Sequence, residues 1–435
     1  MDPVAIGLTG IAAMLVLLAL RAPIAVALGL VSTAGIVALR SPGAAFATLG
    51  SLPYGFSASW TLSAVPMFLL MGTIAFNAGL TARLYVAARL CFGRIPGGLA
   101  VATNFACAGF AAASGSSLAT AAAMGRLAIP EMLRYRYDPA LATSVVAAAG
   151  TLGALIPPSI AMVIYGWFAE QPIGALLVAG ILPGIFTALV YAVMIIGRAW
   201  AAPHIAPPIE ERPSAAEKIK ALLEVWPIPL LTLGVIGGIY SGVTTATEAG
   251  AFGAALTLLI ALSQRQMTWR VFKASVFEAA RTTASIFVIG FSAILFTRFL
   301  AFAGIPTFLA ELIETYSVSP LMLVLLAMVI YVIMGMFLDP LGLMLLTLPI
   351  LVPAFEHAGV DMIWAGVLIV KFLEIGFITP PVGMNAFVIK GIVGDEVPLT
   401  TIFRGLTWFI GAEILVTGVL IAFPQISLFL PGLMN

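Results

Sequence analysis

Charge is scarce in this sequence. Only 9% of its 435 residues are Asp, Glu, Lys or Arg, whereas an ordinary soluble domain carries roughly 25%. The formal net charge is +1, and no segment is basic enough to indicate a nucleic-acid surface. We therefore expect no nucleic-acid partner.

Residues that commonly serve catalysis are also few. Cys91 and Cys107 do not have metal-ligand or redox spacing, and the only histidines are His204 and His357. The sequence contains no Gly-x-Ser-x-Gly nucleophile elbow, no His-x-x-x-His pair and no phosphate-binding loop with its Lys and Ser/Thr. These absences argue against an enzyme and against an ATP-driven pump.

Apolar runs are abundant instead, since 62% of the residues are hydrophobic. Runs of about 20 apolar residues match the roughly 30 Å hydrocarbon thickness of a bilayer. Because backbone groups in lipid must pair within the protein, such runs predict helices. The first run lacks the basic flank and cleavage site of a signal peptide, so we interpret it as a first span. The chain is predicted to be an all-α polytopic membrane protein with the lipid bilayer around it. Clear examples of these runs are Val4–Leu20, Ile173–Gly197, Leu321–Leu338 and Thr407–Phe423.

The two halves of the chain resemble each other at one offset of 223 residues. This offset places Gly153, Pro157 and Pro158 on Gly376, Pro380 and Pro381, and it places the tip around Ser116 on Asp339. A polar, Pro-rich stretch separates the halves and reads as a linker. We predict a first repeat over 1–197, a cytoplasmic linker over 198–225 and a second repeat over 226–435.

Basic residues indicate how the chain crosses the membrane. If the N-terminus is periplasmic, sixteen of the twenty Lys and Arg residues fall on the cytoplasmic side, in accordance with the positive-inside rule. Segment 98–134 then enters and leaves from the cytoplasm, and segment 319–357 enters and leaves from outside. These two segments are predicted to be oppositely oriented re-entrant hairpins. Each is followed by a broken helix, over 139–169 in the first half and over 362–392 in the second.

Inverted repeats with broken helices are typical of secondary transporters. A channel would be expected to repeat its pore unit around an axis normal to the membrane, whereas these halves are inverted. The pattern therefore favours a carrier with alternating access.

The Pro-Pro pairs suggest why the helices break. Proline removes a backbone donor, so carbonyl groups before it lose their helical partners. We expect Gly150 and Gly153 to allow unwinding, and the hydroxyls of Ser114, Ser116 and Ser117 at the facing hairpin tip to complete an oxygen-lined cation site. One such pair alone is more often a simple kink; the repetition favours a site in each half.

The second half offers a related set of groups. Asp339 lies at its hairpin tip, and Thr379 and Asn385 flank its Pro-Pro pair. Asp339 is predicted to ligate a cation or, alternatively, to carry the proton of a proton-coupled transporter.

Four motifs resemble the large membrane subunit of tripartite ATP-independent periplasmic (TRAP) transporters over essentially the whole chain. The resemblance implies an elevator-type carrier of small organic-acid anions in the bacterial inner membrane, driven by Na+. It also implies two partners, a small four-helix membrane subunit and a periplasmic substrate-binding protein. No further four-helix segment is present, so we expect the small subunit to be a separate chain. The motifs are ASGSSLATAAAMG, GTLGALIPPSIAMVIYG, GMFLDPLGLMLLTLPILVP and EIGFITPPVGMNAFVIKGI.

The same resemblance implies positions for the ligands. Sodium would be held by Ser114 and Ser116 with the Gly153–Pro157 turn, and by the Gly376–Pro381 turn with the second hairpin tip. The substrate would lie between the hairpins, near Ser117, Asp339 and Asn385.

Several further charges fall within apolar segments. Arg298 is predicted either to meet a substrate carboxylate or to reach the outer surface. Lys371 and Glu374 lie three residues apart on one helix face, so we expect an ion pair. Glu413 is expected to pair with another buried group or with the partner subunit.

Overall fold

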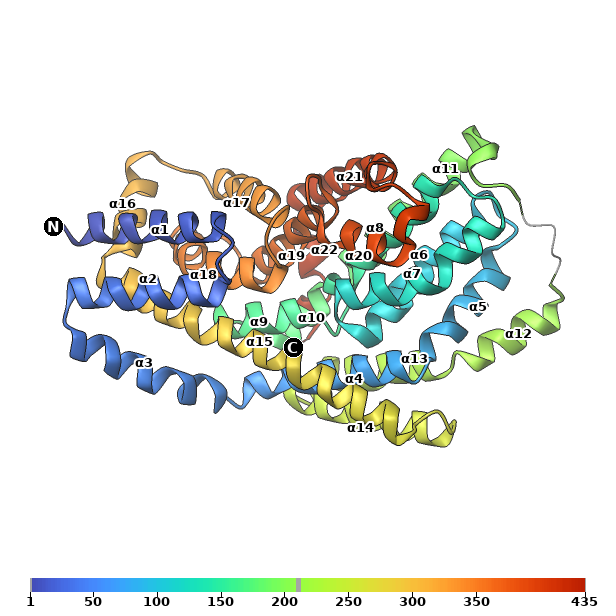
Figure 1. The fold of residues 1–435 in the computed structure, drawn as a ribbon, viewed down its shortest axis with the longest axis horizontal. Coiled ribbons are helices and arrows are strands. Elements are labelled where there is room, and N and C mark those ends of the chain that lie inside the picture. The colour runs from blue at the N-terminus through green and yellow to red at the C-terminus, as the bar shows by residue number, and fades with distance from the viewer. Residues whose placement is uncertain (1, 209–212, 435) are drawn as a thin grey trace.

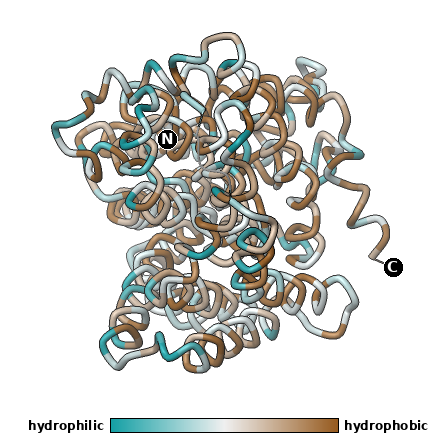
Figure 2. The backbone as a smooth tube through the Cα atoms, turned by 90° about the vertical axis from the view of Figure 1, so that its right-hand side faces the viewer, coloured by the Kyte–Doolittle hydropathy of each residue, from teal (hydrophilic) through white to brown (hydrophobic). Residues whose placement is uncertain are grey.

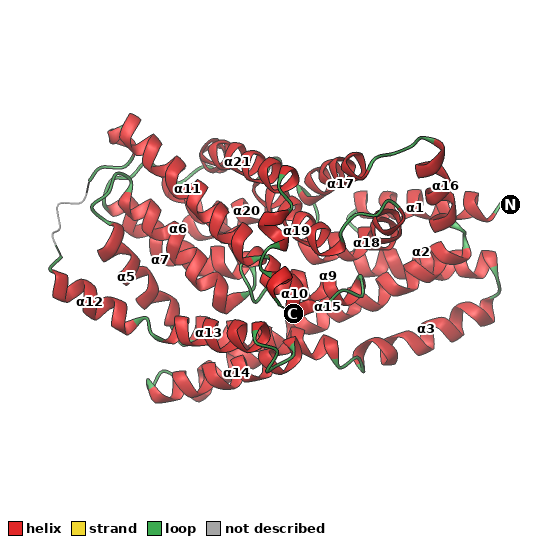
Figure 3. Cartoon of the chain, turned by 180° about the vertical axis from the view of Figure 1, so that it is seen from behind, coloured by secondary structure: helices red, strands yellow, loops and turns green. Residues whose placement is uncertain are grey.

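The computed structural model describes residues 2–208 and 213–434, and every regular element in these ranges is a helix (Figures 1 and 3). In the end-on view of Figure 2 many helices are seen along their axes, and the tube is predominantly hydrophobic in colour. Within the described ranges, five helices are long and apolar enough to cross a membrane, and three bent helix pairs would raise the number to eight. The predicted all-α polytopic architecture is confirmed.

The first half begins with five helices. The third of them, α3 (Pro42–Ser57), is bent by 59° from the next segment, Thr61–Asn77, which contains α4. The helices are α1 (Pro3–Ala19), α2 (Ile24–Leu39), α3 (Pro42–Ser57), α4 (Ala64–Asn77) and α5 (Leu80–Phe92).

The first predicted hairpin consists of α6 (Gly98–Ser114) and α7 (Ser117–Arg134). Gly115 makes the turn with φ +62°, a conformation that favours glycine, and Ser116 caps α7 by accepting from the Ala119 amide. The first broken helix follows as α8 (Pro139–Leu155) and α9 (Ile160–Phe168), bent by 40°. The half ends with α10 (Ile173–Ala179) and α11 (Ile181–Ala201).

The second half repeats this plan. Its hairpin is α17 (Pro320–Gly335) and α18 (Pro340–His357), and its broken helix is α19 (Met362–Ile378) and α20 (Met384–Val393). The remaining helices are α13 (Pro227–Tyr240), α14 (Ala246–Ser263), α15 (Trp269–Phe302), α16 (Ile305–Thr315), α21 (Leu399–Ala422) and α22 (Gln425–Leu428).

The offset of 223 residues holds at the level of helix boundaries. It carries 117–134 onto α18 at 340–357, and 139–155 onto α19 at 362–378. Both Pro-Pro peptide bonds, Pro157–Pro158 and Pro380–Pro381, are cis. Figure 1 places α6 and α7 in the right half and α17 and α18 in the left half, so the two hairpins approach from opposite ends.

The predicted linker over 198–225 is partly helical. α11 continues to Ala201, and an amphipathic helix, α12 (Ala215–Glu224), begins with a capping box between Ser214 and Glu217. Residues 209–212 of this linker, with Arg212 of the expected cytoplasmic set, lie outside the described residues, as do residues 1 and 435 at the ends of the predicted repeats. The cytoplasmic placement of the linker and the repeat limits stay predictions.

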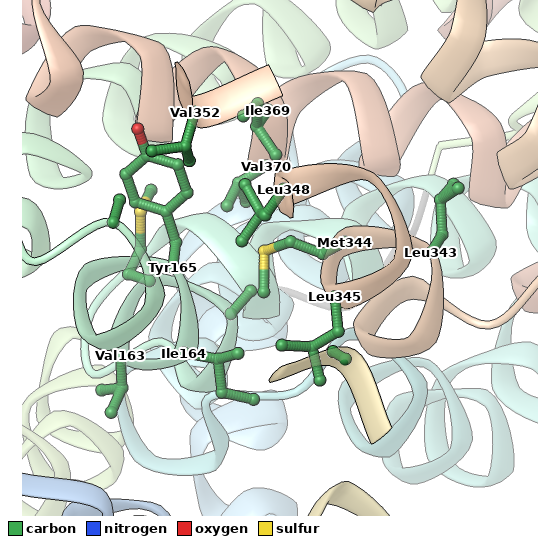
Figure 4. Packing of buried hydrophobic residues seen from close by; sticks show 14 of the residues in the cluster. Val163, Ile164, Tyr165, Leu343, Met344, Leu345, Leu348, Val352, Ile369 and Val370 are labelled. Atoms are coloured by element: carbon green, nitrogen blue, oxygen red, sulfur yellow. The ribbon is translucent and has the colours of Figure 1, made fainter. Parts of the chain in front are cut away.

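One large apolar core joins the two broken helices. Figure 4 shows Tyr165 of α9 among side chains of α18 and α19, including Leu348, Val352 and Ile369. The Tyr165 ring lies over Gly366, where an added Cβ would come within 2.5 Å of it, and its hydroxyl donates to the Met362 carbonyl oxygen at 2.7 Å. Close packing of this kind fixes the second hairpin relative to both broken helices.

Candidate functional site

The tips of the two hairpins border one cavity of about 280 Å³. Gly115, Ser116 and Ser117 line it from the first hairpin, and Asp339 and Pro340 line it from the second. A cavity where opposed re-entrant tips meet is the arrangement in which transporters hold substrates and coupling ions.

The remaining cavity wall comes from both broken helices and from two other helices. α15 contributes Thr282 and Ser285, which carry short polar side chains. Asp339 is the only charged residue among the described lining residues. The other lining residues are apolar: Leu69, Leu118, Ala154, Ile160, Ala161, Ile286, Ile289, Leu341, Leu373 and Phe377.

The first Pro-Pro pair frees two carbonyl oxygens at the end of α8. In a helix the carbonyls of Gly153 and Ala154 would accept from residues 157 and 158, but both are prolines and carry no N–H. The Ser159 hydroxyl donates to the Ala154 oxygen. The Gly153 oxygen is therefore left without its helical donor.

Oxygen atoms of the first hairpin tip gather beside Gly153. The hydroxyls of Ser114 and Thr120 lie 2.8 Å apart, and the Thr120 hydroxyl also donates to the Ser116 carbonyl oxygen at 2.8 Å. A Cβ built on Gly153 would lie 2.6 Å from that Ser116 oxygen and 2.8 Å from the Thr120 hydroxyl. Two hydroxyls and the Ser116 carbonyl oxygen thus lie together beside Gly153, and a cluster of oxygens of this kind suits a small cation.

The tip is also joined directly to the break. The Ile160 amide donates to the Gly115 carbonyl oxygen at 3.3 Å, and the Ser117 hydroxyl donates to the Thr151 carbonyl oxygen at 3.2 Å. A Cβ at Gly115 would come 2.3 Å from the Pro158 oxygen. The hairpin and the broken helix therefore form one packed unit.

The expectation that Gly150 and Gly153 unwind the helix is wrong. Both lie inside α8, which continues to Leu155. Their lack of a side chain serves close approach instead, because a Cβ at Gly150 would lie 2.7 Å from the Ala121 Cβ. The helix breaks only at 156–159, where the prolines leave it no donors.

The second break is built differently. Gly376 packs backbone to backbone against Gly335 of the hairpin, where a Cβ would lie 2.8 Å from the Gly335 Cα. The Gly383 amide donates to the Met336 carbonyl oxygen at 3.3 Å. Thr379 donates to the Ile375 oxygen of its own helix at 2.5 Å and lines an apolar groove between α17, α19 and α21. Pro380 and Pro381 are exposed.

The other predicted site residues are placed at varying distances from the cavity. Asp339 caps α18 through the Gly342 amide at 2.8 Å and borders the cavity. Asn385 is fully buried in α20 and donates to the Ala147 oxygen at 2.9 Å, away from the cavity lining. Arg298 is exposed on α15, thirteen residues or about 20 Å along the helix from Ser285. The structure does not bring Arg298 to this cavity.

Sequence reasoning missed three residues of this region. Thr120 follows Ser116 by four residues, so the helical period alone would have placed it on the same face. Thr282 and Ser285 share a face of α15 for the same reason, but nothing in the sequence indicates that this face meets the hairpins. Their role follows only from the tertiary fold.

The predicted ion pair between Lys371 and Glu374 is confirmed, with 2.7 Å between Nζ and Oε2, and Glu413 joins it within the chain. Glu248, another acidic residue in an apolar stretch of the sequence, caps the exposed start of α14 in a capping box with Thr245.

Comparison with known proteins connects this geometry to a family. Residues 11–426 match the family described as "Tripartite ATP-independent periplasmic transporter, DctM component". The chain is 38% identical to the C4-dicarboxylate TRAP transporter large permease protein DctM of Pseudomonas aeruginosa, over 86% of this chain and 87% of that protein. It is 33% identical to the sialic acid TRAP transporter large permease protein SiaM of Vibrio cholerae, over 94% and 95%.

A solved structure supports the fold. The YdaH transporter of Alcanivorax borkumensis, whose crystal structure is described as having an unusual topology, superimposes with a TM-score of 0.68 at 14% identity, over 98% of this chain and all of that one. At this identity the likeness concerns the fold alone. Together with the sequence matches, these findings show that the chain is a multi-pass membrane protein and a transporter component rather than an enzyme, and that it belongs to the family of TRAP transporter large permeases.

Proposed function

We propose that this permease imports a small organic-acid anion across the bacterial inner membrane, driven by a sodium gradient through an elevator movement of its two hairpins and broken helices. The observation that carries the proposal is the meeting of both hairpin tips on one cavity beside the oxygen cluster of the first break. The similar permeases are named for C4-dicarboxylates and for sialic acid, which are organic acids.

Sodium rather than a protein side chain would balance the anion's charge. The described lining contains no Lys or Arg, and its one charged residue, Asp339, is itself acidic. A cation at the Ser114, Thr120, Ser116 and Gly153 oxygens would supply positive charge next to the cavity. Substrate and sodium would then stabilise each other's binding, as symport requires.

The permease would act with a small four-helix membrane subunit and a periplasmic substrate-binding protein, and its N-terminus would be periplasmic. These partners follow from family membership, and the orientation follows from the distribution of Lys and Arg. The second predicted sodium site, at the Gly376–Pro381 turn with Asp339, belongs to the same proposal.

The first test is the melting temperature of the purified permease in sodium against potassium at equal ionic strength. A ligand that binds only the folded state stabilises it by about 1.4 kcal/mol at ten times its Kd. We expect stabilisation by sodium alone, and its loss in Ser114→Ala. Equal stability in both ions, with a pH dependence that Asp339→Asn abolishes, would instead support proton coupling through Asp339.

The second test reconstitutes all three components in liposomes. Uptake of a labelled dicarboxylate or sialic acid should require an inward sodium gradient and the binding protein. Uptake that persists without sodium would overturn the sodium-driven mechanism.

A further inference from the structure

Three ionisable side chains lie together in the interior, away from the cavity. Lys371 and Glu374 of α19 and Glu413 of α21 are all fully buried. The Lys371 Nζ lies 2.7 Å from the Glu374 Oε2 and 2.7 Å from the Glu413 Oε2. One ammonium group thus contacts two carboxyl groups.

Helix α11 supplies the remaining polar contacts of this cluster. The Tyr191 hydroxyl donates to the Glu413 Oε1 at 2.5 Å, and the Lys371 Nζ donates to the Thr187 hydroxyl at 3.3 Å. The Glu374 Oε1 is buried and accepts no hydrogen bond from the described residues. The Glu413 Oε2 also accepts no hydrogen bond from the described residues, but it lies in ion-pair contact with the Lys371 ammonium, whereas the Glu374 Oε1 has no such contact.

No other charged group compensates the cluster within the described structure. Tyr191 is the only other titratable side chain in contact with it. Arg198 of α11 stacks on Trp408, and Lys390 of α20 pairs with Asp395. The other titratable groups on the packed helices are bonded elsewhere, lie at helix ends or, in the case of Cys107 of α6, carry an uncharged thiol: Tyr165 bonds to Met362, Tyr331 to Thr347 and Asp361 to the Trp364 amide, Arg404 lies in the second turn of α21, and Glu356 and His357 lie at the end of α18.

The charge count is unbalanced if all three groups are ionised. Two carboxylates and one ammonium would leave a net charge of −1 in a fully buried position. Burying an uncompensated charge is among the most costly arrangements in a protein, and more so within a membrane. One proton bound to the cluster would bring its net charge to zero.

We propose that Lys371, Glu374 and Glu413 form a proton-binding site that holds one proton, on the Oε1 of Glu374. Water supplies the proton, which forms an O–H bond to that oxygen, and the reverse step returns it to water. Glu413 keeps its negative charge because the Tyr191 hydroxyl and the Lys371 ammonium both stabilise the carboxylate form. Each carboxyl group accepts one hydrogen bond, but Glu413 has in addition the Lys371 ammonium at its second oxygen, so Glu374, with no group at its Oε1, takes the proton.

The site does not line the cavity, but it shares helix α19 with two residues that do. Leu373 and Phe377, which flank Glu374 on α19, line the cavity. A neutral cluster leaves no net charge buried where α19 packs against α11 and α21. The inference concerns residues of the interior and does not depend on sodium coupling.

Infrared spectroscopy of the purified protein tests the proposal directly. A protonated carboxyl group has a carbonyl stretch that is separate from the bands of carboxylates. Because Asp339 is another partly buried carboxyl group, the experiment uses the Asp339→Asn background. We expect a protonated-carboxyl band at neutral pH that Glu374→Gln removes, and that Glu356→Gln, at the end of α18, leaves intact.

Glu413→Gln provides an independent variant. With only one carboxyl group left to pair with Lys371, Glu374 ionises and the band should disappear again. A band that survives both substitutions, or no band at neutral pH in the Asp339→Asn background alone, would overturn the proposal. The absence of a band in the Asp339→Asn protein would be decisive even if neither Glu374→Gln nor Glu413→Gln folds.

Thermal stability gives a second readout. A proton held more tightly by the folded state than by the unfolded chain stabilises the fold at low pH, and this contribution declines as the pH rises. The melting temperature of the parent should therefore fall more steeply than that of Glu374→Gln as the pH rises from the ordinary Glu pKa of about 4.3 through neutral pH. Parallel curves would count against the bound proton.

Discussion

The two Pro-Pro breaks have the same pattern in sequence and occupy different environments. Pro157 and Pro158 are buried beneath the first hairpin tip, whereas Pro380 and Pro381 are exposed. The helices around them have matching boundaries, so the difference comes from the tips. A tip of Gly and Ser fits against the break and brings its oxygens close, while the Met336–Asp339 tip is bulkier and makes one backbone hydrogen bond to it, at Gly383. Internal symmetry fixes where the helices break, and the side-chain size of each tip decides how closely the tip approaches its break.

The largest effect is expected at the glycine of the first break. In Gly153→Ala the new methyl group would lie 2.6 Å from the Ser116 carbonyl oxygen, so the tip must move away. Overpacking of this kind costs about 1–3 kcal/mol of folding stability. The stabilisation by sodium should vanish as well, and thermal unfolding in sodium and in potassium measures both effects.

The counterpart at the second break sharpens this comparison. Gly376→Ala would place its methyl group 2.8 Å from the Gly335 Cα and should lower stability similarly, but the sodium response of the first break should remain. Gly391→Ala in α20 is the matched control, because its methyl group would meet open space. Equal loss of the sodium response in both alanine variants would show that the two breaks do not act separately.

An intermediate effect is expected from the threonines. Thr120→Val removes the hydrogen bond to the buried Ser114 hydroxyl, which costs about 1–3 kcal/mol, and one of two bonds to the Ser116 carbonyl oxygen, which keeps the bond from the Thr120 amide. It should also weaken sodium binding, seen as a higher sodium concentration at half-maximal stabilisation.

Thr379→Val is the matched variant at the second break. Thr379 bonds only to the Ile375 carbonyl of its own helix, among the described residues, and faces an apolar groove. Its replacement should leave both stability and the sodium midpoint nearly unchanged. A shift as large as that of Thr120→Val would mean that the second break binds sodium as tightly as the first.

Much of this arrangement could be predicted from the sequence, because it depends on local rules. Proline cannot donate a backbone hydrogen bond, and a repeat offset read from a few identities holds for the boundaries of α18 and α19. The role of Gly153 was misread, since close approach and unwinding both require glycine and only the tertiary structure distinguishes them. The positions of Arg298 and Asn385 relative to the cavity, and the contact of Glu413 with Lys371, depend on long-range packing that spacing along the chain does not contain.

The smallest effects are expected at the two helix caps. Ser116 and Asp339 occupy equivalent positions in the repeat, and each caps the second helix of its hairpin. Ser116→Ala removes the cap of α7 and should cost about 0.5–2 kcal/mol, whereas Asp339→Asn keeps an oxygen that can cap α18 and should change stability by about 0.5 kcal/mol or less. If the charge of Asp339 takes part in transport, uptake should fall more in Asp339→Asn than in Ser116→Ala. Asp339→Asn removes the only charge of the described cavity lining, whereas Ser116→Ala keeps the carbonyl oxygen of residue 116. Paired measurements of melting temperature and sodium-driven uptake would separate these contributions, and an Asp339→Asn variant with unchanged uptake would assign Asp339 a capping role alone.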